Sequence, residues 1–311
     1  MRHYENETEF AGKRVADWDP GTGIQDPETT IYRLRLDWDD EDEAWTDRFA
    51  AYLNDPRAAE TTGLVVGAWD TDDSDASSEP IVEALVSARD RLPNLSAIYL
   101  GDIVSEENEI SWIQQSDVSP LFDAYPNLTH FRVRGGTGLS LGTPRHANLR
   151  SLIIESGGLP ANVLHEVAAA EFPALEHLEI WLGTESYGAE ATVEDLAPIL
   201  DGSRWPNLRY LGLRDSDLSD QIAAALAGAP VLERLETLDL SLGTLGDEGA
   251  AALAANPAVA RLKKLDIHYH YVSEAMVEKL KTLGIAEVDA DEPQKPDTYG
   301  GGSHRYVAVG E

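Results

Sequence analysis

The chain has 311 residues, 42% of them hydrophobic, and its 56 acidic against 24 basic residues give a formal net charge of −32. Phosphate backbones and anionic lipids are bound through Lys and Arg, so this balance disfavours binding to nucleic acids and to membrane surfaces. The absence of cysteine excludes disulfides, thiolate catalysis and zinc–sulfur sites.

Residues 1–27 predict a capping segment. The opening "MRHYENETEFAGKR" has no apolar segment typical of a signal peptide, and no run of about 18 apolar residues follows, so we expect a cytoplasmic protein. The stretch "ADWDPGTGIQDP" at 16–27 favours a loop. Such a segment can cover the first apolar surface of an array of repeats.

Two acidic runs come next, at 37–43 and at 70–80. Their carboxylates are of the kind that binds calcium, and they include Asp37, Asp39, Asp40, Glu41, Asp42, Glu43, Asp70, Asp72, Asp73 and Asp75. Neither run has the glycine and the spaced glutamate of an EF-hand loop. The patterns therefore favour solvated loops, the second of which leads into the helical sequence "IVEALVSARDRL".

A repeated motif dominates the rest of the chain. The pattern L-x-x-L-x-L occurs seven times, starting at Leu95, Leu128, Leu149, Leu175, Leu208, Leu235 and Leu262. Weaker copies start at Ile31, Thr61 and Ile285. Each motif predicts a short strand, and segments such as "SDQIAAALAGAP" predict helices that end at Gly or Pro. One strand and one helix cannot bury their apolar faces alone, so stacked copies are expected to share a core.

These motifs resemble those of leucine-rich repeat proteins, and units 208–234 and 235–261 resemble the ribonuclease-inhibitor type. The resemblance implies an α/β leucine-rich repeat solenoid (horseshoe), with a curved parallel sheet on the concave side and helices on the convex side. It covers residues 28–290. The asparagine that links neighbouring turns in the family is absent, so backbone groups or water must replace it. Its place is taken by Gly136, Gly157, Gly183, Ser216, Gly243 and His270.

The opening "FAGKRVADWD" and the tail "HRYVAVGE" are also similar to a bacterial family of leucine-rich repeat proteins. The resemblance implies genes that lie near those of radical-SAM and ATP-grasp enzymes.

In leucine-rich repeat proteins the concave sheet face is the usual contact surface, and its side chains alternate with the buried leucines. Trp, Tyr and Arg are frequent binding hot spots, so a cluster of them on this face predicts a docking site for another protein. The predicted partner-binding residues are Tyr99, His130, Arg132, Arg134, His177, Trp181, Tyr210 and Arg214. The alternative is that these side chains pair across the strands with Glu155, Glu179 and Asp239 and cover the sheet.

Other motifs offer weaker candidates. "LDIHYHYV" places Asp266, His268 and His270 close together, with Asp239 on the neighbouring strand, but three groups on one strand rarely converge on one metal ion, and exposed polar residues are favoured. The glycine-rich "RGGTGLSLG" at 134–142 lacks a phosphate-binding context and predicts a tight connection in place of a helix. No G-x-S-x-G nucleophile motif occurs. We therefore expect no enzyme, no metal and no cofactor.

The C-terminal residues 291–311 form a Pro- and Gly-rich tail that ends in the strand-like "RYVAV". The tail could add a strand to the last edge of the sheet, or be presented flexibly through Gly300–Gly302. The sequence thus predicts a non-enzymatic protein-interaction module, an adaptor, scaffold or recognition subunit. The alternative is a carrier or substrate protein whose tail is recognised or modified by a partner enzyme.

Overall fold

The computed structural model describes every residue except 1–4, 38–42, 72, 301 and 311. The possible calcium ligands Asp39, Asp40, Glu41, Asp42 and Asp72 lie outside the described residues. The described residues divide into two compact units, of which unit 1 lies within residues 5–155 and 169–174, and unit 2 within residues 156–168 and 175–310. Nowhere in the described part is a helix long and apolar enough to cross a lipid bilayer.

Unit 1 is built on one sheet whose strands follow each other in chain order. The strands are β1 Glu9–Phe10, β2 Lys13–Asp17, β3 Thr30–Leu34, β4 Gly63–Val66, β5 Ala97–Leu100, β6 His130–Arg134 and β7 Ser151–Glu155. The first two pair antiparallel, and β2 to β7 pair in parallel. The helices are α1 Trp45–Leu53, the short 3₁₀ helix η1 Ala58–Glu60, α2 Glu79–Ser87 and α3 Ser119–Ala124. The strand β2 thus extends the repeat sheet into the segment predicted as a cap.

Unit 2 repeats this plan. Its parallel strands are β8 His177–Gly183, β9 Tyr210–Ser216, β10 Thr237–Asp239, β11 Lys264–Asp266 and β12 Glu287–Asp289. The α-helices are α4 Ala161–Ala169, whose last residue falls in unit 1, α5 Ala197–Leu200, α6 Ser219–Leu226, α7 Asp247–Ala254 and α8 Glu274–Lys281. The 3₁₀ helices are η2 Glu185–Tyr187, η3 Val193–Leu196, η4 Pro230–Glu233 and η5 Val259–Arg261.

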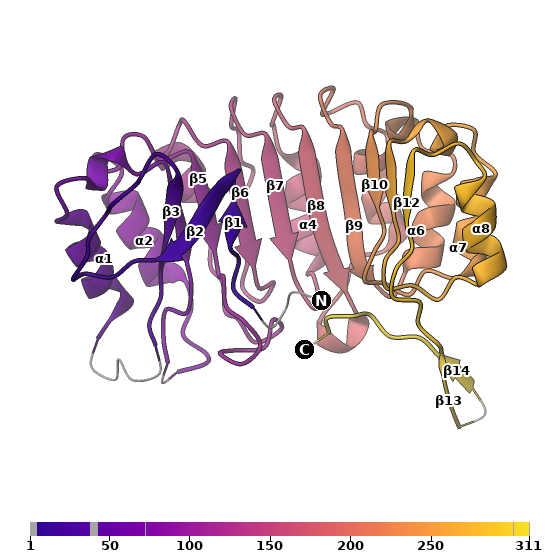
Figure 1. Ribbon diagram of the computed structural model, residues 1–311, viewed down its shortest axis with the longest axis horizontal. Coiled ribbons are helices and arrows are strands. Elements are labelled where there is room, and N and C mark those ends of the chain that lie inside the picture. Colours follow the sequence, from indigo (N-terminus) through magenta and orange to yellow (C-terminus); the bar gives the residue numbers. More distant parts are fainter. Residues whose placement is uncertain (1–4, 38–42, 72, 301, 311) are drawn as a thin grey trace. The chain divides into compact units, whose positions relative to one another are not determined.

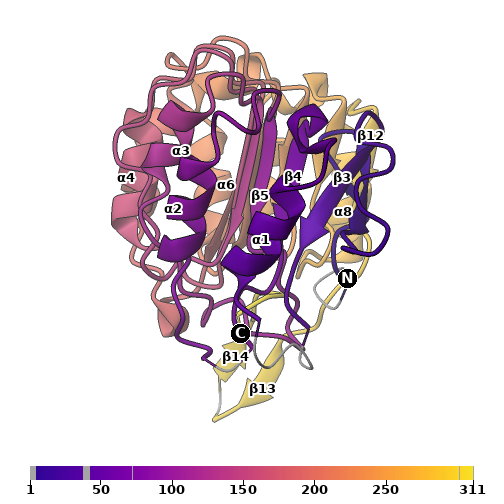
Figure 2. The same cartoon turned by 90° about the vertical axis from the view of Figure 1, so that its left-hand side faces the viewer.

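In each unit the helices pack on one face of the sheet (Figures 1 and 2). The residues that open the seven motifs are all buried there, namely Leu95, Leu128, Leu149, Leu175, Leu208, Leu235 and Leu262. We call the opposite face of each sheet its open face. Residues 135–150, all of them described, contain no helix, so the glycine-rich "RGGTGLSLG" makes the direct connection that its sequence predicts.

Backbone hydrogen bonds take the place of the missing asparagines in unit 2. The carbonyls at four of the substituted positions accept an N–H from the following repeat: Gly157 from Thr184 (2.9 Å), Gly183 from Asp217 (3.3 Å), Ser216 from Thr244 (3.0 Å) and His270 from Gln294 (2.7 Å). This satisfies polar groups that the fold buries. The prediction that backbone groups replace the side-chain ladder is therefore confirmed at these four turns.

The tail turns back onto unit 2 and does not continue its sheet. The strands β13 Asp297–Tyr299 and β14 Gly302–His304 form a separate antiparallel hairpin. Residues 305–310 then run as an irregular segment with a bend at Ala308, and Val309 is buried. The idea that "RYVAV" adds an edge strand is wrong, and the observed path counts against a freely presented tail.

Candidate functional site

The open faces carry the three rows of side chains that the repeat spacing predicts. In unit 1, His130 is paired in register with Ala97 and Ser151, and Arg132 with Tyr99 and Ile153. In unit 2 the first row reads His177, Tyr210, Thr237, Lys264, and the second reads Glu179, Gly212, Asp239, Asp266. The eight predicted site residues form two clusters, one in each unit.

The cluster of unit 1 centres on the buried Glu155. Its carboxylate accepts a hydrogen bond from Arg132 (2.6 Å) and pairs with Arg134 at 3.3 Å. The Arg132 guanidinium also lies 4.3 Å from the centre of the Tyr99 ring, a cation–π distance. Burial raises the pKa of Tyr99 well above its ordinary value, so its hydroxyl stays neutral and can donate to Glu155 (3.5 Å).

The N-terminal segment lies on this open face and covers part of it. Phe10 belongs to a buried apolar cluster with Tyr99, and the two ring centres are 5.8 Å apart. Glu7 pairs with Arg132 at 2.9 Å. The segment predicted as a cap therefore covers part of the open face, while its strand β2 continues the sheet.

A second ion pair fixes the same segment. Arg33 donates to Asp102 (2.6 Å) and to Asp17 (2.7 Å), while the N–H of Glu7 donates to Asp102 (3.2 Å). Burial raises the pKa of Asp102, although Arg33 acts in the opposite direction. These contacts hold residues from three distant parts of the chain together.

The cluster of unit 2 centres on Glu179. One oxygen of its carboxylate accepts hydrogen bonds from Trp181 Nε1 (2.8 Å) and from Arg214 Nη1 (2.6 Å). Tyr210 Oη donates to Glu179 at 3.1 Å and to Asp239 at 2.7 Å. Arg214 also pairs with Asp239 at 3.3 Å, so its guanidinium joins two carboxylates.

The charges in this cluster are strongly coupled. Burial would raise the pKa of Glu179, but Arg214 and the side chains of His177 and Trp181 lower it well below its ordinary value. Burial raises the pKa of Asp239 despite the nearby Arg214. The guanidinium is thus what allows two carboxylates to share a buried position.

A stacked ring pair remains partly exposed above these carboxylates. The rings of His177 and Tyr210 lie 3.9 Å apart at an angle of 9°. Both residues are half-buried, and the Tyr210 hydroxyl is fixed by its two hydrogen bonds. The stack is therefore a rigid, accessible aromatic feature of the open face of unit 2.

The expectation of solvent-facing side chains is wrong for Tyr99, Arg134 and Trp181, which are buried. The physical reason is pairing with neighbours, because Trp181 lies beneath the Arg214 guanidinium at 5.2 Å and donates to Glu179. Pairing across the strands, the alternative reading of the sequence, describes both clusters. Half-buried positions remain for His130, Arg132, His177, Tyr210 and Arg214.

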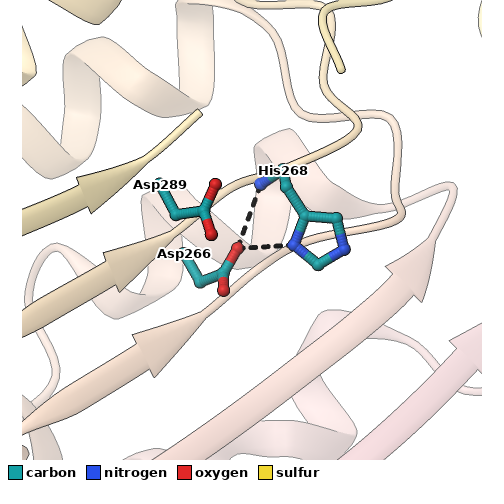
Figure 3. Close-up of side chains that lie close together, drawn as sticks. All are labelled: Asp266, His268 and Asp289. Carbon is teal, nitrogen blue, oxygen red and sulfur yellow. Dashed lines mark hydrogen bonds and ion pairs between the residues drawn. The ribbon is translucent and has the colours of Figure 1, made fainter. Parts of the chain in front are cut away.

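A third group of polar residues lies at the end of unit 2. Figure 3 shows Asp266, His268 and Asp289, whose potential metal-ligand atoms lie within 4.8 Å of one another. Lys264 already neutralises the carboxylates, at 2.8 Å from Asp266 and 3.4 Å from Asp289. His270 turns away, and its Nε2 lies 3.1 Å from the carbonyl of Ala290. The predicted grouping of His270 with Asp266 is therefore wrong, and Lys264 offsets only part of the negative charge of the cluster.

The Asp266–His268 pair predicts a pH-dependent stability. His268 Nδ1 lies 2.7 Å from Asp266, whose hydrogen bond raises the pKa of His268 against the effect of burial. Burial would raise the pKa of Asp266, but His268 and Lys264 lower it to about 2. A raised histidine pKa stabilises the fold below the unfolded value of about 6.5, and a lowered aspartate pKa does so above the unfolded value of about 3.9.

We therefore expect His268→Gln to reduce the free energy of unfolding most between about pH 4 and about pH 6.5. The difference from wild type should shrink as the pH rises through the raised pKa of His268, and also as it falls towards that of Asp266. Urea unfolding at a series of pH values measures this. If His268→Gln lowered the free energy of unfolding by the same amount well above and well below neutral pH, the pairing of His268 with Asp266 would be contradicted.

Some of these residues carried a sequence signal and others did not. Asp289 is in register with Asp266, and it follows from the weak repeat that starts at Ile285. Glu7 and Phe10 belong to no repeat position, so no periodic signal indicates that they reach the open face. Asp102 lies in the repeat that starts at Leu95, two residues after the strand β5.

Comparison with known proteins agrees with the repeat. A family model described as Leucine Rich repeat matches residues 234–254. A crystal structure of a protein from Bacteroides fragilis has a TM-score of 0.81 and 29% identity, covering 89% of this chain and 76% of that one. An internalin from Listeria monocytogenes has a TM-score of 0.36 and 15% identity, covering 78% of this chain and 72% of its own.

No curated protein matches the chain. The repeat itself, the parallel sheet and helices of each unit, the family model and the similarity to the Bacteroides structure all indicate the same family. The chain is a leucine-rich repeat protein with an α/β repeat fold.

Proposed function

We propose that the chain is a non-enzymatic protein-interaction module, an adaptor, scaffold or recognition subunit, that binds a partner protein on the open face of unit 2. Leucine-rich repeats are typical of such modules, because stacked repeats give an extended binding surface. The observation that carries the proposal is the half-exposed stack of His177 and Tyr210.

The geometry of this stack favours recognition. Aromatic side chains bury a large area at a low entropic cost, and hot spots concentrate in rigid, central positions. The Tyr210 ring is held by His177 on one side and by the hydrogen bonds of its hydroxyl to Glu179 and Asp239. Little conformational freedom is left to lose on binding.

The charges around the stack indicate what the partner presents. Arg214 is already paired with Glu179 and Asp239, so it gains little from an acidic partner group. A planar or aromatic group that covers the His177–Tyr210 stack suits this surface better. The open face of unit 1 is less favourable, because Phe10 and Glu7 already contact it.

The test compares partner capture by the intact chain and by its variants, from a lysate of the organism that encodes it. We expect Tyr210→Ala combined with His177→Ala to weaken capture by roughly thirtyfold, equivalent to about 2 kcal/mol. Tyr210→Phe keeps the ring and should retain most of the binding. Thermal unfolding of each variant shows whether the fold is intact.

An exposed aromatic residue elsewhere supplies the control. Trp112 in unit 1 is 58% exposed, so Trp112→Ala removes a large apolar side chain outside the open face of unit 2. We expect it to leave capture unchanged. Equal loss in Trp112→Ala and in the double variant, or full capture by a folded double variant, would count against this surface.

A further inference from the structure

The C-terminal tail is held on unit 2 in the manner of a bound peptide. It returns from the β13–β14 hairpin and runs along the ends of the strands β11, β10 and β9 towards its terminus (Figure 1). The N–H of Ala308 donates to the carbonyl of Leu242 (2.8 Å), and the N–H of Val309 donates to Asp215 Oδ1 (2.9 Å). Tyr269 Oη donates to the carbonyl of Val307 (3.4 Å).

The repeats supply a regular row of contact points for this segment. Asp215, Leu242 and Tyr269 occupy the same position in three successive repeats, and each has a left-handed backbone, with φ of 49°, 67° and 56°. Such a conformation costs a non-glycine residue about 1 kcal/mol or more. Each of these three residues contacts the tail, so the tail lies along this row of turns.

Arg305 makes the polar side-chain contacts at one end of the tail. Arg305 Nη1 donates to Asp220 Oδ2 (2.8 Å) and to the carbonyl of Thr244 (3.0 Å), and the guanidinium lies 5.8 Å from the centre of the Tyr271 ring. A Cβ on Gly246 would lie only 2.3 Å from the same nitrogen, so the bare glycine makes room for the guanidinium.

An acidic cavity adjoins this end and reinforces its preference for a cation. It has a volume of about 1140 Å³, and Arg305 is the basic residue in its wall. The acidic side chains that line it are Glu185, Glu190, Glu194, Asp217, Asp220 and Glu248. A guanidinium is therefore attracted to this end from several sides.

The other end of the tail buries an apolar side chain. Val309 is only 4% exposed although only two residues follow it in the sequence. At Gly310 a Cβ would lie 3.1 Å from the Tyr187 ring, so the segment passes close to that ring. The contacts thus involve an arginine and, four residues later, a buried valine.

We propose that unit 2 carries a peptide-recognition groove along the turns at Asp215, Leu242 and Tyr269, and that residues 305–310 are its resident ligand. A partner protein that offers an extended segment of the same chemistry competes with the tail for this groove. The groove is separate from His177 and Tyr210, so this proposal and the proposed function can fail independently.

The first experiment adds the tail in trans to a chain whose own tail is released. The substitutions Arg305→Ala and Val309→Asp alter only the tail and leave the groove intact. A fluorescent peptide with the sequence of residues 303–310, SHRYVAVG, is then titrated and followed by anisotropy. We expect saturable binding of the peptide to this variant. Wild type should bind the peptide at least about tenfold more weakly, because its own tail occupies the groove at a high effective concentration.

Matched peptides and variants test the arginine end. A peptide with alanine in place of its arginine should bind about tenfold more weakly, since a charge-assisted hydrogen bond is lost. Adding Gly246→Ala to the released variant should weaken binding of the unchanged peptide by a similar factor. No saturable binding to the folded released variant, or equal binding to wild type, would overturn the proposal.

A second measurement uses the intact chain in case the released variant does not fold. Gly246 has an ordinary negative φ, so Gly246→Ala alters the space for Arg305 without imposing a left-handed backbone on alanine. We expect faster hydrogen exchange at the amides of Ala308 and Val309 in this variant than in wild type. Unchanged exchange at both amides would show that Arg305 does not hold the tail in place, and would overturn the arginine requirement.

Discussion

Gly183→Ala is expected to reduce the free energy of unfolding by about 4 kcal/mol or more, the range of severe backbone and steric defects. Gly183 ends the strand β8 with φ of 71°, and an added Cβ would lie 1.9 Å from the carbonyl oxygen of Gly157. The atoms that it meets are backbone, so no side-chain rotation relieves the overlap. The two segments must move apart, which breaks the hydrogen bond from Thr184 to Gly157.

Gly228→Ala supplies the control for this substitution. A Cβ at Gly228 meets nothing within 4 Å, and the backbone there is not left-handed. We expect the free energy of unfolding to change by at most about 1 kcal/mol, because alanine restricts the unfolded chain and meets no clash in the folded one. Urea unfolding of both variants gives the comparison. If Gly183→Ala lowered the free energy of unfolding no more than Gly228→Ala does, the close approach of the backbone at Gly183 to that at Gly157 would be contradicted.

Arg214→Met is expected to cost about 3–5 kcal/mol of stability, because it leaves buried charges without their partner. Arg214 joins Glu179 at 2.6 Å and Asp239 at 3.3 Å, and both carboxylates are buried. Methionine keeps much of the apolar side chain but removes the charge. Arg261→Met is the matched control, since Arg261 pairs with Glu233 on the surface. This substitution should lower the free energy of unfolding by at most about 1 kcal/mol.

The loss in Arg214→Met should depend on pH. In wild type the lowered pKa of Glu179 contributes stability above its unfolded value of about 4.3, and this contribution is lost as the pH falls through the folded value. Without the guanidinium, burial raises the pKa of Glu179, and protonation relieves the charge. The difference from wild type should therefore shrink from neutral pH towards about pH 4. A difference that grows on acidification would contradict the coupling of these groups.

The repeat motif predicts the strands and their register well. The first strand residue follows each motif's opening leucine by two positions, as at His177 after Leu175 and Tyr210 after Leu208. Register follows because alternate residues must enter one shared core. The spacing of the motifs is therefore sufficient to predict that Trp181 lies beside Arg214.

The accessibility of those side chains could not be predicted in the same way. Alternation tells which face a residue is on, but burial on that face depends on neighbours of opposite charge and on distant segments. Trp181 is covered by Arg214 within its own sheet, whereas Tyr99 is covered by Phe10, which is 89 positions away in the sequence and has no repeat signal. Long-range contacts of this second kind are what the sequence leaves open.

The tail changes how the repeats of unit 2 can come apart. In a stacked array each repeat contacts only its neighbours, so the ends can fray one repeat at a time. Arg305 contacts Asp220, which follows β9, and Tyr271, which follows β11, so it spans the intervening repeat. The last repeats therefore cannot separate from the array without also breaking a contact two repeats away, which couples their opening into one cooperative step.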